Sequence, residues 1–137
     1  MIKIKQNMYG VSFDINLEGS INILTGDSGS GKSFLCRAIQ SYHKFIEDIP
    51  CVYIDYNILD LRDDEDFILS VCKNVKLVTL DNADLYLTPE LLRKLKEMCE
   101  TIIVCVKDIS GLNIQDACIY KVNYSGNQIT TIKTKEI

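Results

Sequence analysis

The sequence predicts a three-layer α/β fold in which helices cover both faces of a mostly parallel sheet. Short apolar segments with strand character alternate with longer segments whose apolar residues recur at helical spacing, a pattern typical of a parallel sheet flanked by helices. Antiparallel strands are expected at the N-terminus, and a hairpin at the C-terminus. The 137 residues contain no linker or repeat, so a single domain, residues 1–137, is expected.

The first half of the chain alternates strand and helix patterns. Strands are expected at residues 2–6, 11–17, 20–25 and 51–54. The first two alternate apolar and polar side chains, which predicts an antiparallel meander leading into the main sheet. Helical spacing from Phe34 to Ile46 predicts a helix between the third and fourth strands, and this helix ends before Pro50.

The second half continues this alternation and ends in a hairpin. Strands are expected at residues 76–80, 101–106, 117–123 and 128–133, and helices after residues 63 and 88. The acidic run 63–66 lies at the start of one helix, where the helix dipole favours negative charge. Thr88 caps the other helix and Pro89 suits its first position. A turn at residues 125–127 joins the last two strands.

Residues 26–33 spell G-D-S-G-S-G-K-S, which matches the G-x-x-x-x-G-K-S phosphate loop, between a predicted strand and a predicted helix. Its glycines allow close approach of the backbone to an anion. The loop N–H groups and the helix N-terminus then converge on a polyphosphate. Lys32 is expected to reach the terminal phosphates of a nucleoside triphosphate. The expected nucleotide-binding residues are Gly26, Asp27, Ser28, Gly29, Ser30, Gly31, Lys32, Ser33 and Phe34.

A magnesium site is expected beside this loop. The apolar strand at residues 76–80 ends in Asp81, and a carboxylate at such a strand end can hold Mg²⁺ directly or through water. The Ser33 hydroxyl lies in the phosphate loop, where it would hold the same ion. Ser33 and Asp81 are therefore the expected metal ligands.

Together these motifs resemble the core of an ABC-type ATPase, one of the P-loop NTPases. The resemblance covers most of the chain; its sharpest parts are the phosphate loop and residues 80–84, with weaker matches at residues 11–25, 101–108 and 116–126. It implies the three-layer P-loop NTPase fold, one strand between the loop strand and the Asp81 strand, and ATP with Mg²⁺ as cofactors. Independently, no N-K-x-D sequence is present to select guanine.

The chain also departs from that family. A glutamate follows the magnesium aspartate there, whereas this chain has Asn82, whose amide can orient water but cannot accept its proton. Asp84, two residues further on, is the alternative acid. The expected catalytic residues are therefore Lys32, Asn82 and Asp84. The helical signature subdomain is missing, because the segment between Ser33 and Asp81 is too short to hold it.

Three functions remain open from the sequence. The first is a slow or partner-dependent ATPase in which a homodimer or another protein completes the site. The second is a hydrolysis-deficient ATP-binding switch or assembly module. The third is a small P-loop kinase, which is weakest because Arg37, Arg62 and Arg93 are spread through separate elements and no lid-length insertion is present.

The composition limits which binding partners and which cellular compartment are expected for this protein. The net charge of −4 gives no general attraction to nucleic acid or to an anionic membrane, and the basic cluster at residues 93–96 is interpreted as a solvated helix face. No segment approaches the ~20 apolar residues of a membrane span. Six cysteines without a C-x-x-C pair are typical of reduced core cysteines, so a cytoplasmic protein without disulfides or a metal-binding cysteine cluster is expected.

Overall fold

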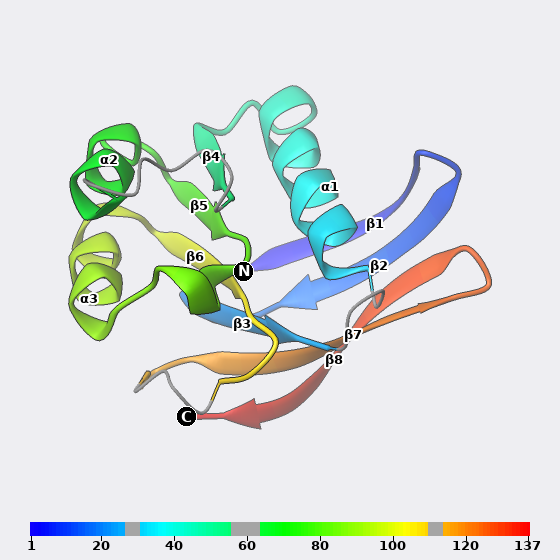
Figure 1. Ribbon diagram of the computed structural model, residues 1–137. Coiled ribbons are helices and arrows are strands. Elements are labelled where there is room, and N and C mark those ends of the chain that lie inside the picture. Colours follow the sequence, from blue (N-terminus) through cyan, green and yellow to red (C-terminus); the bar gives the residue numbers. More distant parts are fainter. Residues whose placement is uncertain (27–30, 56–63, 110–113) are drawn as a thin grey trace.

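A computed structural model of the protein describes residues 1–26, 31–55, 64–109 and 114–137 (Figure 1). The strands are β1 (Ile2–Met8), β2 (Val11–Leu17), β3 (Ile21–Thr25), β4 (Cys51–Ile54), β5 (Leu77–Leu80), β6 (Thr101–Cys105), β7 (Cys118–Ser125) and β8 (Gln128–Glu136). The helices are α1 (Lys32–Phe45), α2 (Asp64–Val71) and α3 (Pro89–Met98), with a short 3₁₀ turn at Ala83–Leu85. Each strand and helix expected from the sequence patterns is therefore confirmed as a local element.

The described strands form one mixed eight-stranded sheet in the order β1-β2-β8-β7-β3-β6-β5-β4. The five strands β7, β3, β6, β5 and β4 are parallel to one another. The pairs β1–β2 and β7–β8 are antiparallel, and β2 pairs in parallel with β8. The C-terminal hairpin therefore lies between the N-terminal pair and β3. One strand, β6, lies between β3 and β5, which is the spacing expected for the loop strand and the Asp81 strand.

The three-layer fold expected from the sequence is wrong. The described part of the chain is strand-dominated, with 41% strand and 28% helix, and its mixed sheet curls into a half-barrel instead of forming a helix-flanked parallel sheet. The reason lies in the β1, β2, β7 and β8 half, where antiparallel pairs replace helical crossovers and the sheet curls. The fold is thus not the P-loop NTPase core, and the expected kinship with ABC-type ATPases is also wrong.

The core has two parts, one on each face of the parallel strands (Figure 1). On one face, α2 and α3 pack on β3, β5 and β6, with Ile23, Leu95 and Val104 buried between them. On the other face, α1 packs on the parallel strands and against the curled half, where Phe13 and Ile39 are buried. This second cluster holds the start of α1 over the strand ends.

The turn from β2 to β3 joins the curled half to the parallel half through two buried polar side chains. Asn22 is fully buried and bonds both backbone groups of Gly19, accepting from its N–H at 2.9 Å and donating to its carbonyl at 2.8 Å. The Tyr120 hydroxyl on β7 accepts a hydrogen bond from the Glu18 N–H at 2.7 Å. These bonds satisfy backbone groups that the turn leaves without a sheet partner.

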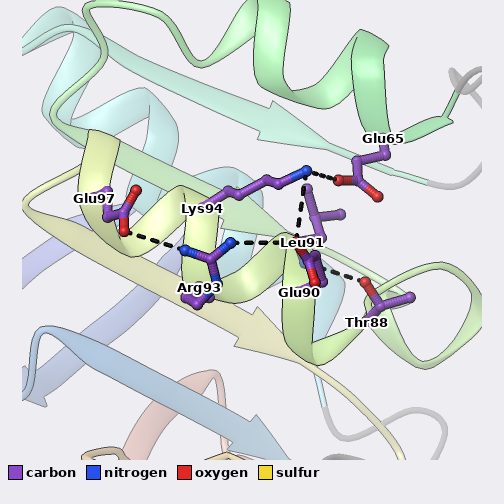
Figure 2. A network of polar contacts seen from close by, with 7 residues as sticks. All are labelled: Glu65, Thr88, Glu90, Leu91, Arg93, Lys94 and Glu97. Carbon is purple, nitrogen blue, oxygen red and sulfur yellow. Dashed lines mark hydrogen bonds and ion pairs between the residues drawn. The ribbon is translucent and has the colours of Figure 1, made fainter.

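Figure 2 shows how the start of α3 is capped and how its charged face is paired. The Thr88 hydroxyl accepts a hydrogen bond from the Leu91 N–H at 3.1 Å, and Pro89 occupies the first turn. The Lys94 ammonium donates to Glu65 on α2 at 2.7 Å, while Arg93 pairs at 3.2 Å with acids one turn before and after it. These basic residues lie on a solvent-exposed helix face, as predicted, and exposed pairs of this kind contribute little stability.

Replacing Thr88 with alanine should lower the free energy of unfolding by about 1 kcal/mol, because the Leu91 N–H loses its acceptor. Thr88→Ser keeps the hydroxyl and should remain within a few tenths of a kcal/mol of the parent protein. Urea denaturation measures both. An alanine variant as stable as the serine variant would contradict the capping role.

Candidate functional site

A cavity of about 370 Å³ opens at the carboxyl ends of β5 and β6, beside the start of α1. Its wall consists of residues 31–34 at the start of α1, Asp81, Asn82 and Asp84 after β5, and residues 105–107 at the end of β6. Since carboxyl ends of parallel strands share one edge of a sheet, segments far apart in the sequence meet there. A volume of this size is within the usual range for small-molecule sites.

The cavity gathers most of the site residues expected from the sequence. Its wall contains Gly31, Lys32, Ser33 and Phe34 together with all three expected polar residues of the β5 end. Gly26 follows β3 directly, and its carbonyl accepts a hydrogen bond from the Lys32 ammonium. The remaining expected nucleotide-binding residues, Asp27, Ser28, Gly29 and Ser30, lie outside the residues that the structure describes.

The first turn of α1 presents the positive end of its helix dipole to this cavity. Gly31 is the N-cap residue, and among the described residues no side chain caps the helix and no acid lies in its first turn. The first N–H groups of a helix have no intrahelical acceptor, and the helix dipole adds partial positive charge there. The α3 N-terminus differs, because the Thr88 side chain caps it and Glu90 places a negative charge in its first turn. The start of α1 is therefore suited to an anion.

Asp81 is buried, with 3% of its surface exposed, and two hydrogen bonds hold its carboxylate in place. The Tyr53 hydroxyl donates to Oδ2, and the Asn82 N–H donates to Oδ1 at 3.0 Å. Burial, together with the bond to Asp81, raises the pKa of the Tyr53 phenol well above its ordinary value, so Tyr53 remains a donor at neutral pH. A carboxylate has about four acceptor positions, so Asp81 can still bind a cation.

Asn82 and Asp84 both line the cavity, but the Asn82 side chain is hydrogen-bonded whereas Asp84 is exposed. Asn82 has φ 51°, a left-handed conformation that asparagine adopts more readily than most residues. Its Nδ2 donates to Asp55 Oδ1 at 3.0 Å, which ties the amide to the end of β4. Asp84, in the 3₁₀ turn, is exposed and lines the same cavity. Of the two expected water-positioning residues, Asp84 alone has a group that can accept a proton.

Three aromatic rings surround Phe34 beside the cavity. The centroid of its ring lies 6.0 Å from Tyr9 in the β1–β2 turn, 5.6 Å from Phe13 and 6.3 Å from Tyr124 at the end of β7. Tyr124 also packs on the phosphate loop, because a Cβ added to Gly31 would lie 2.9 Å from its Cδ2 atom. Tyr9 is 66% exposed, so this cluster of aromatic rings is open to a ligand on the Tyr9 side.

Sequence reasoning missed the partners of Asp81 and the second cation of the site. Tyr53 lies inside an apolar strand, where nothing marks its hydroxyl as a partner of Asp81. Lys107 follows β6 and lines the cavity with Lys32, but it was assigned no role in the site from the sequence, although it lies in the matched segment 101–108. The position of each strand end in the sequence was the only available signal, since such ends meet at one edge of the sheet.

Two of the six cysteines contradict the expectation that all are reduced. The structure pairs Cys36 of α1 with Cys105 of β6 as a disulfide. Cys105 also lines the cavity. Cys51, Cys72, Cys99 and Cys118 are free thiols.

Comparison of the sequence with known proteins finds no matching family model and no matching curated protein. Among the residues that the structure describes, no helix has both the length and the apolar character needed to cross a membrane.

The close approach of Gly31 to Tyr124 gives a stability prediction. Gly31→Ala meets both a positive φ of 89° and the Tyr124 ring, whereas Gly10→Ala meets a φ of 74° with no atom within 4 Å. The Gly10 variant should lose about 1 kcal/mol of unfolding free energy, and the Gly31 variant about 1–3 kcal/mol more. Urea denaturation compares them. Equal losses would show that Tyr124 does not restrict the loop.

Proposed function

We propose that this protein binds ATP with magnesium in the cavity at the start of α1 and hydrolyses it slowly or with the help of a partner subunit. The observation that carries the proposal is the composition of the cavity wall. Lys32 and Ser33 of the phosphate loop share this wall with Asp81 and Asp84 from the end of β5. A polyphosphate chain and its metal ion require cationic and acidic groups in this arrangement.

The phosphates would be bound by the positive end of α1 and by lysines. The backbone N–H groups of the first helical turn, which begins at Lys32, supply donors. In the structure the Lys32 ammonium donates to the Gly26 carbonyl, so its side chain reaches back to the residue that follows β3. Lys107 adds a second lysine to the cavity wall. This supports binding of a highly charged anion in a protein whose net charge is negative.

Magnesium would be held by the Ser33 hydroxyl and the Asp81 carboxylate. Both lie in the cavity wall, and the bonds from Tyr53 and the Asn82 N–H orient the carboxylate. Oxygen ligands of this type suit Mg²⁺, which usually combines one or two carboxylates with substrate phosphates and water. The donor set therefore fits the ion.

The aromatic group supports a nucleotide over an inorganic polyphosphate. Tyr9 is exposed beside Phe34, and an aromatic face stacks on a nucleobase with about 1–3 kcal/mol of binding energy. ATP is preferred to GTP because the chain has no N-K-x-D sequence to select guanine.

Hydrolysis is expected to be slow because the site has only a weakly placed group to accept the proton of the attacking water. Asp84 is the group we assign to accept the proton of the attacking water, while Asn82 contributes only orientation. A well-placed general base accelerates such a step by ~10²–10⁴-fold, whereas Asp84 is a solvent-exposed residue of the 3₁₀ turn. A partner subunit, either a second copy or another protein, would close the open side of the site around Asp84.

The second candidate is an ATP-binding switch without turnover. The observation that favours it is the bond between the Asn82 amide and Asp55, because this bond engages the side chain next to Asp81. A site can bind a nucleotide tightly without accelerating its cleavage. Phosphate release measured over a dilution series of the protein separates the candidates, since a partner-dependent ATPase loses specific activity on dilution.

Replacing Lys32 with alanine should weaken ATP binding by at least about 100-fold, because a charge-assisted contact to phosphate is lost. Lys44→Ala, at the exposed end of the same helix, removes an equal charge outside the cavity and should leave the affinity within about twofold. Calorimetric titration with ATP and magnesium measures both variants. Unchanged affinity in the Lys32 variant would refute the site.

Replacing Asp81 with asparagine should remove the magnesium dependence of ATP binding, because the neutral amide is a poor ligand for Mg²⁺. Asp84→Asn should keep that dependence and lower any turnover. ATP titrations with and without magnesium provide the measurement. Persistent magnesium-dependent binding in the Asp81 variant would show that another group holds the ion.

A further inference from the structure

Beneath the cavity, Cys36, Asp81 and Cys105 converge from three elements. Their sulfur and carboxylate ligand atoms all lie within 4.8 Å of one another. Cys36 is on the second turn of α1, Cys105 ends β6, and Asp81 follows β5. The three side chains are 0%, 1% and 3% exposed. Among the described residues this is the one group of three potential metal ligands, and it is buried.

We propose that the reduced Cys36 and Cys105 thiols, together with Asp81, form a binding site for a thiophilic divalent cation such as Zn²⁺. A site with two thiolates and a carboxylate binds Zn²⁺ in preference to Mg²⁺, because Mg²⁺ is a harder ion that favours oxygen ligands. Three protein ligands leave a fourth tetrahedral position, which water can occupy. Asp81 and Cys105 also line the open cavity, so the ion has a path from solvent.

The surroundings of the three residues suit a metal site. The Tyr53 hydroxyl and the Asn82 N–H hold the Asp81 carboxylate, and hydrogen bonds to a ligand from outside the coordination sphere orient it for the metal. The Cα atoms of Cys36 and Cys105 are 7.8 Å apart, beyond the usual range of about 4.4–6.8 Å for disulfides. This backbone spacing leaves room for the two sulfurs to separate around a cation.

Binding requires the dithiol form of the cysteine pair. A reducing thiol converts the disulfide by exchange: two R–SH and Cys–S–S–Cys give two cysteine thiols and one R–S–S–R. The cation then replaces two thiol protons, which are released to solvent, and binds the ionised carboxylate as its third protein ligand. The oxidised pair has no thiolate to offer, so binding depends on the redox state of the protein.

The site also has a consequence for the nucleotide cavity, and this consequence, unlike the site itself, rests on the proposed function. Asp81 is the carboxylate assigned to magnesium there. A thiophilic cation bound between the two sulfurs would engage the same side chain, so the two ions would compete for Asp81.

Cobalt(II) binding tests the site without any nucleotide. The protein is reduced with a phosphine, which does not supply a thiol ligand, and titrated with Co²⁺ while the sulfur-to-cobalt charge-transfer absorption is recorded. We expect one Co²⁺ per chain, displaced by Zn²⁺, and no such band in the unreduced protein. Absence of the band after reduction would overturn the proposal whether or not the protein binds ATP.

Variants locate the ion. Cys36→Ala and Cys105→Ala should each lower the cobalt affinity by more than about 100-fold, since losing even an outer hydrogen-bond partner costs 10–100-fold. The double variant Cys72→Ala/Cys99→Ala is the matched control, because it removes two buried free thiols outside the site. It should keep the band. Loss of the band in the control with retention in the Cys36 variant would place the ion elsewhere and refute the site.

Two further measurements keep the test decisive if an alanine variant unfolds. Circular dichroism reports whether each variant is folded, and Cys36→Ser provides a milder change that removes the thiolate. Asp81→Asn should keep the charge-transfer band from the two sulfurs but weaken cobalt binding by at least tenfold. Unchanged affinity in this variant would remove Asp81 from the ligand set.

Discussion

The packing of α1 against the concave face of the sheet is the constraint on which the site depends. Leu35, Ala38 and Ile39 are fully buried there, and close packing leaves the helix little freedom to shift. Its first turn is thereby held over the carboxyl ends of β3, β5 and β6. The curled β1, β2, β7 and β8 half supplies the other side of this contact, so the half-barrel itself helps to place the cavity.

Local patterns in the sequence were sufficient to predict the strands and helices but not their assembly. Alternation in residues 11–17 shows that one face of β2 is buried, yet it carries no information about which strand pairs with it. The structure pairs β2 with β8, near the other end of the chain. Because eight of the nine residues of β8 are not buried, their polarity gave no sign of an interior sheet position. The three-layer expectation failed for that reason.

The site shows the same division between local and long-range information. Lys32 and Ser33 could be predicted from the phosphate-loop motif, and Asp81 from its place at the end of an apolar strand, because the ends of parallel strands meet at one edge of a sheet. Tyr53, Lys107 and the cysteine pair could not, since their roles depend on register and helix placement. The cysteines were interpreted as reduced core residues because they lie in apolar segments without a C-x-x-C pair, whereas the fold brings Cys36 and Cys105 together.

A protein NMR titration with ATP and magnesium tests most directly whether the cavity at the start of α1 is the nucleotide site. The account predicts saturable shifts of the backbone amides of residues 31–34 and 81–84, with smaller changes near Tyr9 from ring stacking. Shifts confined to the exposed residues of β8, or none at millimolar nucleotide, would contradict it.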